Sequence, residues 1–131
     1  MVTEVRKDVQ KDYAAALRRL KRHNNSMRDV VLMTFDVVKM HEDYFVTAVK
    51  IENMVVLKWV SGKIWKELRR TNYHYGMKRI GEVYRQEVIG VMVEWIKNEK
   101  LDMEKVDQYA NYIMKLSENC SQRLKFLADK E

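Results

Sequence analysis

The chain has 131 residues and a formal net charge of +6, and 47% of its residues are hydrophobic while 34% are charged. This hydrophobic content excludes a disordered chain, and the length suits one domain with one core. The charged fraction and the lack of an 18-residue apolar run argue against an integral membrane protein. We expect no secretory signal peptide because charges begin at Glu4, and the single cysteine, Cys120, cannot form an intramolecular disulfide. These features favour a protein assembled inside a cell.

Turn-forming residues are scarce in this sequence. Proline is absent and glycine occurs four times, whereas proteins rich in β-strands and turns depend on both. We therefore predict an all-α fold, a single helical-bundle domain over residues 1–131. We expect four long helices, mostly antiparallel, with room for a fifth short one, because the apolar stripes described below allow five helical segments.

The first predicted helix covers residues 3–23. Its apolar residues recur at helical spacing on one face: Val5, Val9, Tyr13, Ala16, Leu17 and Leu20. The pattern stops at residues 24–25. Ser26, followed three residues later by Asp29, resembles a capping box and predicts that the second helix begins there.

The second predicted helix covers residues 27–51, and its pattern is ambiguous. Nine valines fall between Val30 and Val60, and β-branched residues favour strands, so a hairpin over residues 30–60 with turns at 41–43 and 52–53 is an alternative. We prefer a helix because neither turn contains Gly or Pro and because strict apolar and polar alternation does not persist.

Two further helices are predicted over residues 54–71 and 77–98, with Gly76 ending the connection between them. Gly81 and Gly90 lie inside the second of these helices. Each costs about 1 kcal/mol relative to alanine in a helix interior, so each is expected to permit a close contact.

The last predicted helix starts after Asp102, a favourable N-cap residue, with Glu104 in its first turn. Its apolar residues follow a pattern close to a heptad repeat: Val106, Tyr109, Ile113, Leu116, Cys120, Leu124 and Leu127. This spacing suits antiparallel bundle packing or a short coiled coil. Because Cys120 lies in that stripe, we expect a buried, inert thiol.

The sequence carries no recognisable catalytic motif. His41-Glu42 does not continue into HExxH, and Gly76 and Gly81 lack the partners of a phosphate-binding loop. Asp36, with residues 41–43, could supply metal ligands, but a solvated surface is the preferred interpretation. We therefore predict a protein that is not an enzyme and has no catalytic residues, no cofactor and no metal site.

Positive charge is concentrated in two blocks. Residues 1–25 carry a net charge of +4 and residues 61–80 carry +5, whereas residues 81–118 carry −3. Basic residues at helix ends can simply complement the helix dipole, but two such blocks in one chain favour contact with a polyanion. The candidate nucleic-acid-binding residues are Lys11, Arg18, Arg19, Lys21, Arg22, Lys63, Lys66, Arg69, Arg70, Tyr73, Tyr75, Lys78 and Arg79. No motif that reads bases is present, so we expect contact without sequence specificity.

The aromatic residues divide into core and surface candidates. Nine Met, three Trp and seven Tyr exceed what a small bundle core readily hides, so some are expected in contacts between subunits. Trp59 and Trp95 are predicted to be core residues. Trp65, flanked by Lys63 and Lys66, is the candidate for self-association.

A basic, proline-free chain of this length, rich in Met and Tyr, resembles the small structural proteins of archaeal viruses. It is most similar in character to the virion coat proteins of bicaudaviruses such as the Acidianus two-tailed virus. The resemblance covers the whole chain, from MVTEVRKD to LKFLADKE. It implies a four-helix-bundle coat protein that self-associates in the virion, from a virus of a hyperthermophilic acidophile.

The same resemblance implies where the protein acts and with what. The expected partners are copies of itself, other virion proteins and viral DNA, and contact with a membrane surface stays open. The expected location is the virion, after synthesis in the host cytoplasm. The alternative function is a homodimeric accessory protein that binds DNA without sequence specificity.

Overall fold

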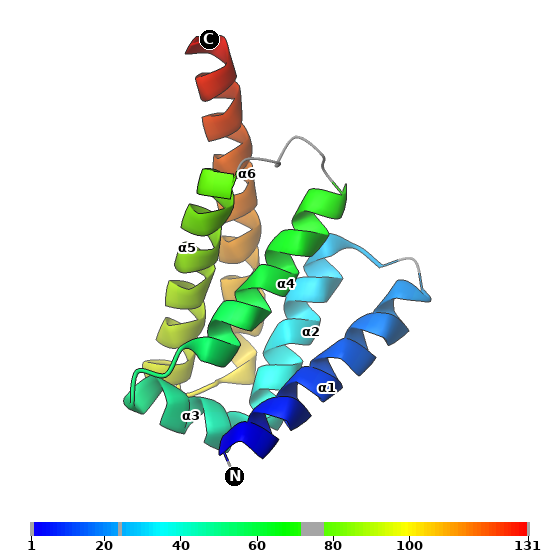
Figure 1. Cartoon of the computed structure of the whole chain (residues 1–131), viewed down its shortest axis with the longest axis vertical. Coiled ribbons are helices and arrows are strands. Elements are labelled where there is room, and N and C mark those ends of the chain that lie inside the picture. Colours follow the sequence, from blue (N-terminus) through cyan, green and yellow to red (C-terminus); the bar gives the residue numbers. More distant parts are fainter. Residues whose placement is uncertain (1, 24, 72–77, 131) are drawn as a thin grey trace.

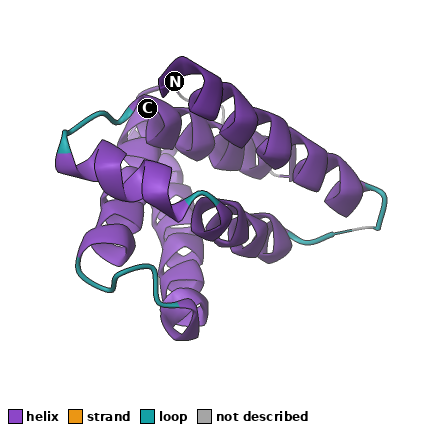
Figure 2. Cartoon of the chain, turned by 90° about the horizontal axis from the view of Figure 1, so that it is seen from below, coloured by secondary structure: helices purple, strands orange, loops and turns teal. Residues whose placement is uncertain are grey.

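The computed structural model describes residues 2–23, 25–71 and 78–130. Within these ranges it leaves undescribed the side chains of residues 2–5, 71, 78, 79, 117, 120, 121, 123–125 and 127–130. The elements are α1 (Val2–Lys21), α2 (Met27–Met40), α3 (Glu42–Lys50), α4 (Val55–Thr71), α5 (Lys78–Lys97), the 3₁₀ turn η1 (Met103–Lys105) and α6 (Val106–Lys130). The predicted all-α class is confirmed, because every regular element of the described residues is helical (Figure 2).

The predicted number of helices is wrong, because the described residues form six α-helices rather than four or five. The extra boundary lies at His41, where φ is −111° and ψ is 38°, so the segment predicted as one helix over 27–51 divides into α2 and α3. Helix α3 is nine residues long and crosses the lower end of the bundle in Figure 1. The capping box that starts α2 is confirmed, since the Ser26 N–H donates to Asp29 Oδ2 at 3.0 Å and the Asp29 N–H donates to Ser26 Oγ at 3.2 Å.

Helix α2 lies at the centre of the molecule and contacts α1, α4 and α6. Seven of its 14 residues are buried, and they point in several directions around the helix: Val30, Val31, Met33, Thr34, Phe35, Val37 and Val38. In α2, buried packing therefore outweighs the preference of β-branched residues for strands. The hairpin over residues 30–60 is therefore wrong, since α2, α3 and the start of α4 occupy that range.

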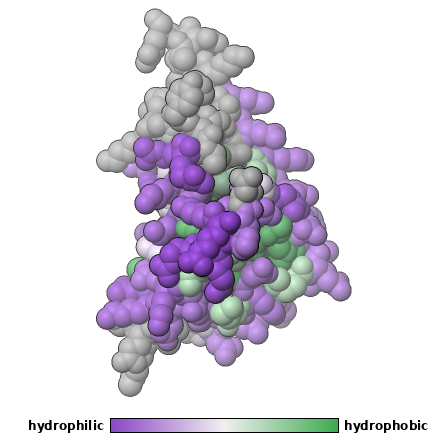
Figure 3. All heavy atoms as spheres, turned by 90° about the vertical axis from the view of Figure 1, so that its right-hand side faces the viewer, coloured by the Kyte–Doolittle hydropathy of each residue, from purple (hydrophilic) through white to green (hydrophobic). Residues whose placement is uncertain are grey.

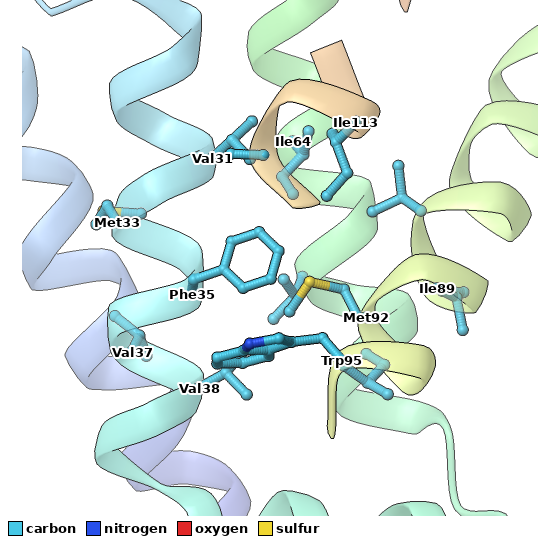
Figure 4. Close-up of a cluster of buried hydrophobic side chains, with 14 of the residues drawn as sticks. Val31, Met33, Phe35, Val37, Val38, Ile64, Ile89, Met92, Trp95 and Ile113 are labelled. Carbon is cyan, nitrogen blue, oxygen red and sulfur yellow. The ribbon is translucent and has the colours of Figure 1, made fainter. Parts of the chain in front are cut away.

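The core forms where α2, α4, α5 and α6 meet (Figure 4). Phe35 of α2 meets the Trp95 ring edge to face, with the ring centroids 4.7 Å apart. Trp95 is fully buried, as predicted, and its indole N–H donates to the Asp102 carbonyl oxygen at 2.9 Å. This bond ties the end of α5 to the connection that precedes α6.

Helices α1 and α4 lie side by side and run in the same direction, unlike the antiparallel neighbours in the bundle (Figure 1). The Tyr13 and Trp59 rings are 5.4 Å apart, and eight residues further along both helices Lys21 meets Glu67. The Tyr13 hydroxyl donates to Thr34 Oγ1 at 2.9 Å, because the Thr34 hydroxyl is already donated to the Val30 carbonyl. The C-terminal ends of α1 and α4 therefore reach the same end of the molecule.

Trp65 is a core residue, so its prediction as an exposed self-association residue is wrong. Its side chain is 5% exposed and its ring lies 5.3 Å from that of Tyr84. A Cβ atom on Gly81 would stand 2.6 Å from the Trp65 indole nitrogen, so the predicted close contact at Gly81 is confirmed. At Gly90 the chain itself makes no such contact, since a Cβ atom there would meet no side chain and no other helix within 4 Å.

Helix α6 is the longest helix, with 25 residues, and it extends beyond the ends of α4 and α5 (Figure 1). Val106, Ile113 and Leu116 of its predicted stripe are buried, and Tyr109 is partly buried against the core. The predicted burial of the Cys120 thiol concerns a side chain outside the described set.

Candidate nucleic-acid interface

The two basic blocks meet at one end of the molecule because α1 and α4 are parallel there. Residues 18–21 end α1 and Arg22 follows directly, and residues 66–70 lie in the last turns of α4. We call the exposed cations of this end the basic face, which consists of Arg18, Lys21, Arg22, Lys66, Arg69 and Arg70. Figure 3 views the side on which α1 ends, and strongly hydrophilic side chains gather near the middle of that view.

Glu67 joins the two helices beneath the basic face. Its carboxylate accepts from Lys21 Nζ at 2.7 Å and from Arg70 Nε at 3.1 Å, and its side chain is 5% exposed. Burial alone raises the pKa of this carboxyl, but hydrogen bonds and positive charge from Lys21 and Arg70 more than offset burial, so the pKa is lowered overall. Glu67 therefore stays ionised at neutral pH and neutralises part of the basic face.

Glu67 is not among the residues predicted from the sequence, although the sequence holds a signal for it. It is the one acidic residue among residues 61–80, and it lies seven residues after Val60 and three after Ile64 on the apolar stripe of α4. A carboxylate on a buried stripe requires a cation, because an unpaired buried charge is costly.

The cations of α1 point in three directions. Lys21 faces α4, whereas Arg19 lines a groove of about 430 Å³ between α1 and α2 together with Asp29 and Asp36. Burial in that groove raises the pKa of Asp36. Arg18 and Arg22 are exposed.

Lys11 is also exposed, but it lies seven residues before Arg18, about 10 Å along the helix. It continues the outer stripe of α1 toward the N-terminus. Of the candidate cations of α1, Lys21 is therefore held by Glu67, Arg19 lies in the groove with Asp29 and Asp36, and the others point to solvent.

The cations of α4 divide in a similar way. Arg70 is held by Glu67, and Lys63 Nζ lies 5.1 Å from the centre of the Trp59 ring in a cation–π contact. Lys66 and Arg69 are exposed and take part in no ion pair among the described residues. These two residues, with Arg18 and Arg22, are the cations best placed to meet phosphate groups.

The remaining candidates lie outside the described residues. Tyr73 and Tyr75 fall in the undescribed segment 72–77, and the side chains of Lys78 and Arg79 are undescribed at the start of α5. Their predicted roles stay predictions.

The acidic and histidine cluster considered for a metal is dispersed. His41 Nε2 lies 2.8 Å from Asp12 Oδ2 on α1, and Glu42 pairs with Lys39 at 3.2 Å. Asp36 lies in the α1–α2 groove instead. Among the described side chains, no three potential metal ligands are grouped.

A second surface feature lies on the opposite side of the bundle. Helices α5 and α6 enclose an open groove of about 940 Å³, with Glu87 and Glu94 on α5 and Tyr109 and Tyr112 on α6. Burial raises the pKa of Tyr109, and the charges of Glu99 and Glu94 raise it further. The groove also contains Lys115 of α6, so acidic and basic side chains share its lining.

The arrangement separates charge across the molecule. Lys and Arg side chains at one end can bind phosphate oxygens, which fixes position without reading sequence. Comparisons with protein-family models, with curated proteins and with solved structures found no match to this chain. None of the helices in the described ranges has a stretch long and apolar enough to cross a bilayer.

Proposed function

We propose that this protein is a non-enzymatic structural protein of a virus particle that associates with copies of itself and contacts nucleic acid through the basic face. The proposal combines the resemblance of the sequence to archaeal virus coat proteins with the two surfaces described above. Other virion proteins and an anionic membrane surface are the further partners that such a charged bundle could meet.

One observation supports the nucleic-acid contact above the others. Two basic blocks, separated by about 40 residues of sequence, lie together because Lys21 and Arg70 share the buried Glu67 carboxylate. Basic residues that only complemented helix dipoles would need no such convergence, since each helix end is stabilised separately. Convergence places more positive charge within one Debye length, which strengthens attraction to a polyanion.

The contact is tested by DNA binding as a function of salt. The test variant replaces four exposed cations of the basic face with alanine: Arg18, Arg22, Lys66 and Arg69. The control variant removes the same number of charges elsewhere: Lys50, Lys97, Lys100 and Lys105. Affinity for a random-sequence duplex is measured by fluorescence anisotropy at several NaCl concentrations.

The slope of log affinity against log salt should be shallower by roughly 3.6 in the test variant, because four phosphate contacts are lost and each contributes about 0.9. The control variant should keep the wild-type slope within about 1, since its changes lie away from the basic face. Equal slopes in both variants would show that net charge alone drives binding.

A homodimeric DNA-binding accessory protein is the second candidate. The basic face favours it as much as it favours a coat protein, because phosphate contact requires no lattice. Electron microscopy of purified protein separates the two. Ordered filaments or sheets support the coat function, whereas discrete dimers that bind DNA support the accessory function.

A further inference from the structure

Helix α3 presents four side chains to solvent at the end of the bundle that it crosses. Asp43, Val46, Thr47 and Lys50 follow the spacing of one helix face, three, four and seven residues after the first, and all four are exposed. The buried residues of α3 lie on its other face, against the bundle. We call these four residues the α3 stripe, and it faces away from the rest of the chain.

The two charges of the α3 stripe have no ion-pair partner among the described residues. Asp43 differs in this from its neighbour Glu42, which is held by Lys39 at 3.2 Å. Lys50 likewise takes part in no ion pair there. The two charges are seven residues apart, about 10 Å along the helix, which is too far for them to pair with each other. Each is therefore available to a partner from outside the chain.

The surroundings of Lys50 favour an acidic partner. Lys50 lines a groove of about 560 Å³ between α3 and the end of α5, where Lys97 and Lys100 add positive charge. Glu42 and Glu52 also line this groove, but Glu42 is already held by a lysine of α2. The cations outnumber the carboxylates, so the end of the α3 stripe that carries Lys50 attracts a further negative charge.

The α3 stripe is complementary to itself. If two copies of α3 lie antiparallel about a two-fold axis at the middle of the stripe, Asp43 of each copy faces Lys50 of the other, and Val46 faces Thr47. An isologous contact requires such reciprocity, because each patch meets a copy of itself. A stripe with the same charge at both ends would repel itself in this arrangement. The order of the charges therefore fits a second copy of this chain.

Apolar surface at the same end of the molecule supports this contact. Val46 is 45% exposed, Ile51 directly after α3 is 63% exposed, and Val55 at the start of α4 is 50% exposed. Removing such side chains from water favours association. An anionic lipid surface suits the stripe less well than a second copy does, because it would repel Asp43.

The basic face lies far from α3. Helix α4 begins shortly after α3 ends, and its 17 residues span about 25 Å to the last turns, where the basic face lies (Figure 1). Two patches that meet about a two-fold axis face each other, so the remainders of the two copies extend in opposite directions. Pairing through the α3 stripe therefore leaves both basic faces on the outside of the dimer.

We propose that two copies of this chain pair through the α3 stripe and that the dimer bridges two segments of nucleic acid, one on each basic face. This inference rests on the proposed contact between the basic face and nucleic acid, and it adds the surface that joins the copies. A single straight duplex cannot contact both basic faces, because they point away from each other. The dimer thus holds two duplexes together.

The pairing is tested by charge reversal in the full chain. Asp43→Lys places like charges opposite each other in a homodimer, and so does Lys50→Asp. Sedimentation velocity at low salt over a range of concentrations measures association, and circular dichroism verifies that each variant is folded. We expect each variant alone to associate at least tenfold more weakly than wild type. An equimolar mixture of the two should recover association, because both pairs are then matched.

A second comparison uses the apolar centre of the stripe. Val46→Glu places a carboxylate at the middle of the contact and should weaken association by at least tenfold. Val83→Glu is the matched control, because Val83 is also an exposed helical valine, 37% exposed, but lies on α5 outside the stripe. Its association should equal that of wild type.

Bridging is measured by capture of one duplex by another. A random-sequence duplex is fixed to beads, and the protein-dependent retention of a second, fluorescent duplex is recorded. Wild type should retain it, and Val46→Glu should retain at least tenfold less while binding a single duplex with the wild-type salt slope. The control variant of the salt experiment lacks Lys50, so it too should keep that slope but bridge less well. The variant without the four cations of the basic face should lose both activities.

The outcomes separate this inference from the proposed function. Association that the α3 changes do not weaken, or a mixture that stays dissociated, would overturn the pairing while leaving self-association by another surface. Dimers that pair through α3 and bind DNA but retain no second duplex would overturn the bridging. A wild-type protein that binds DNA yet stays monomeric at every concentration would overturn the pairing and the proposed self-association together, and capture of lipid vesicles or of another protein by α3 in that monomer would assign the stripe to that partner instead.

Discussion

Replacing Glu67 with glutamine tests how the fold and the basic face depend on each other. Glutamine keeps the shape of the side chain but removes the charge that Lys21 and Arg70 share. A buried ion pair that loses one partner can cost 3–5 kcal/mol, but the Lys21 and Arg70 side chains are 42% and 59% exposed and remain hydrated. We therefore expect a loss of about 1–2 kcal/mol at pH 7.

The loss should depend on pH in a defined direction. The pKa of Glu67 is lowered in the folded protein from its ordinary value of 4.5, so the stabilisation is complete above that value and disappears as pH falls through the folded pKa. Urea denaturation followed by circular dichroism at pH 7 and at pH 3 or below measures the difference between wild type and Glu67→Gln. The difference should shrink toward zero in acid, because Glu67 is then neutral in both states.

The same substitution should strengthen DNA binding. It removes a negative charge from beneath the basic face and releases Lys21 and Arg70, so affinity for duplex DNA should rise by about three- to tenfold at low salt. Loss of stability with gain of affinity is the expected combination. A variant as stable as wild type at pH 7, a difference that does not change with pH, or a weaker affinity for DNA would each refute the reasoning.

Two further predictions concern the helices. Gly81→Ala should destabilise the fold by about 1–2 kcal/mol in urea denaturation, because the new methyl group meets Trp65 and the steric cost exceeds the gain in helix propensity. Gly62→Ala should be neutral or should stabilise the fold by up to about 1 kcal/mol, because a methyl group there meets open space. Equal effects of the two substitutions would contradict this packing. Ser26→Ala should cost about 1 kcal/mol by removing the side-chain acceptor of the α2 cap, and restoring that stability with Ser26→Asp would show that the cap is responsible.

The bounds of the helices exposed on one face were predicted well from the sequence, whereas α2 was predicted with its correct start but without the break that separates it from α3. α1 and α4 expose one face to solvent, so their apolar residues recur at 3.6-residue spacing and their bounds lie close to those predicted. α2 is covered on several sides, and four of its seven buried residues are valines, a composition typical of a strand. The backbone angles at His41 are accessible to any residue, so the break between α2 and α3 needs neither Gly nor Pro. The sequence therefore contains no helix-breaking residue at this position.

Which residues share a surface depends on how the helices pack, and the local sequence does not show this. Both basic blocks were found as charge clusters, but only the parallel arrangement of α1 and α4 places Lys21 and Arg70 on one carboxylate. Likewise, Gly81 and Gly90 look alike in the sequence, and only the structure separates them, because one receives Trp65 and the other receives nothing from its own chain.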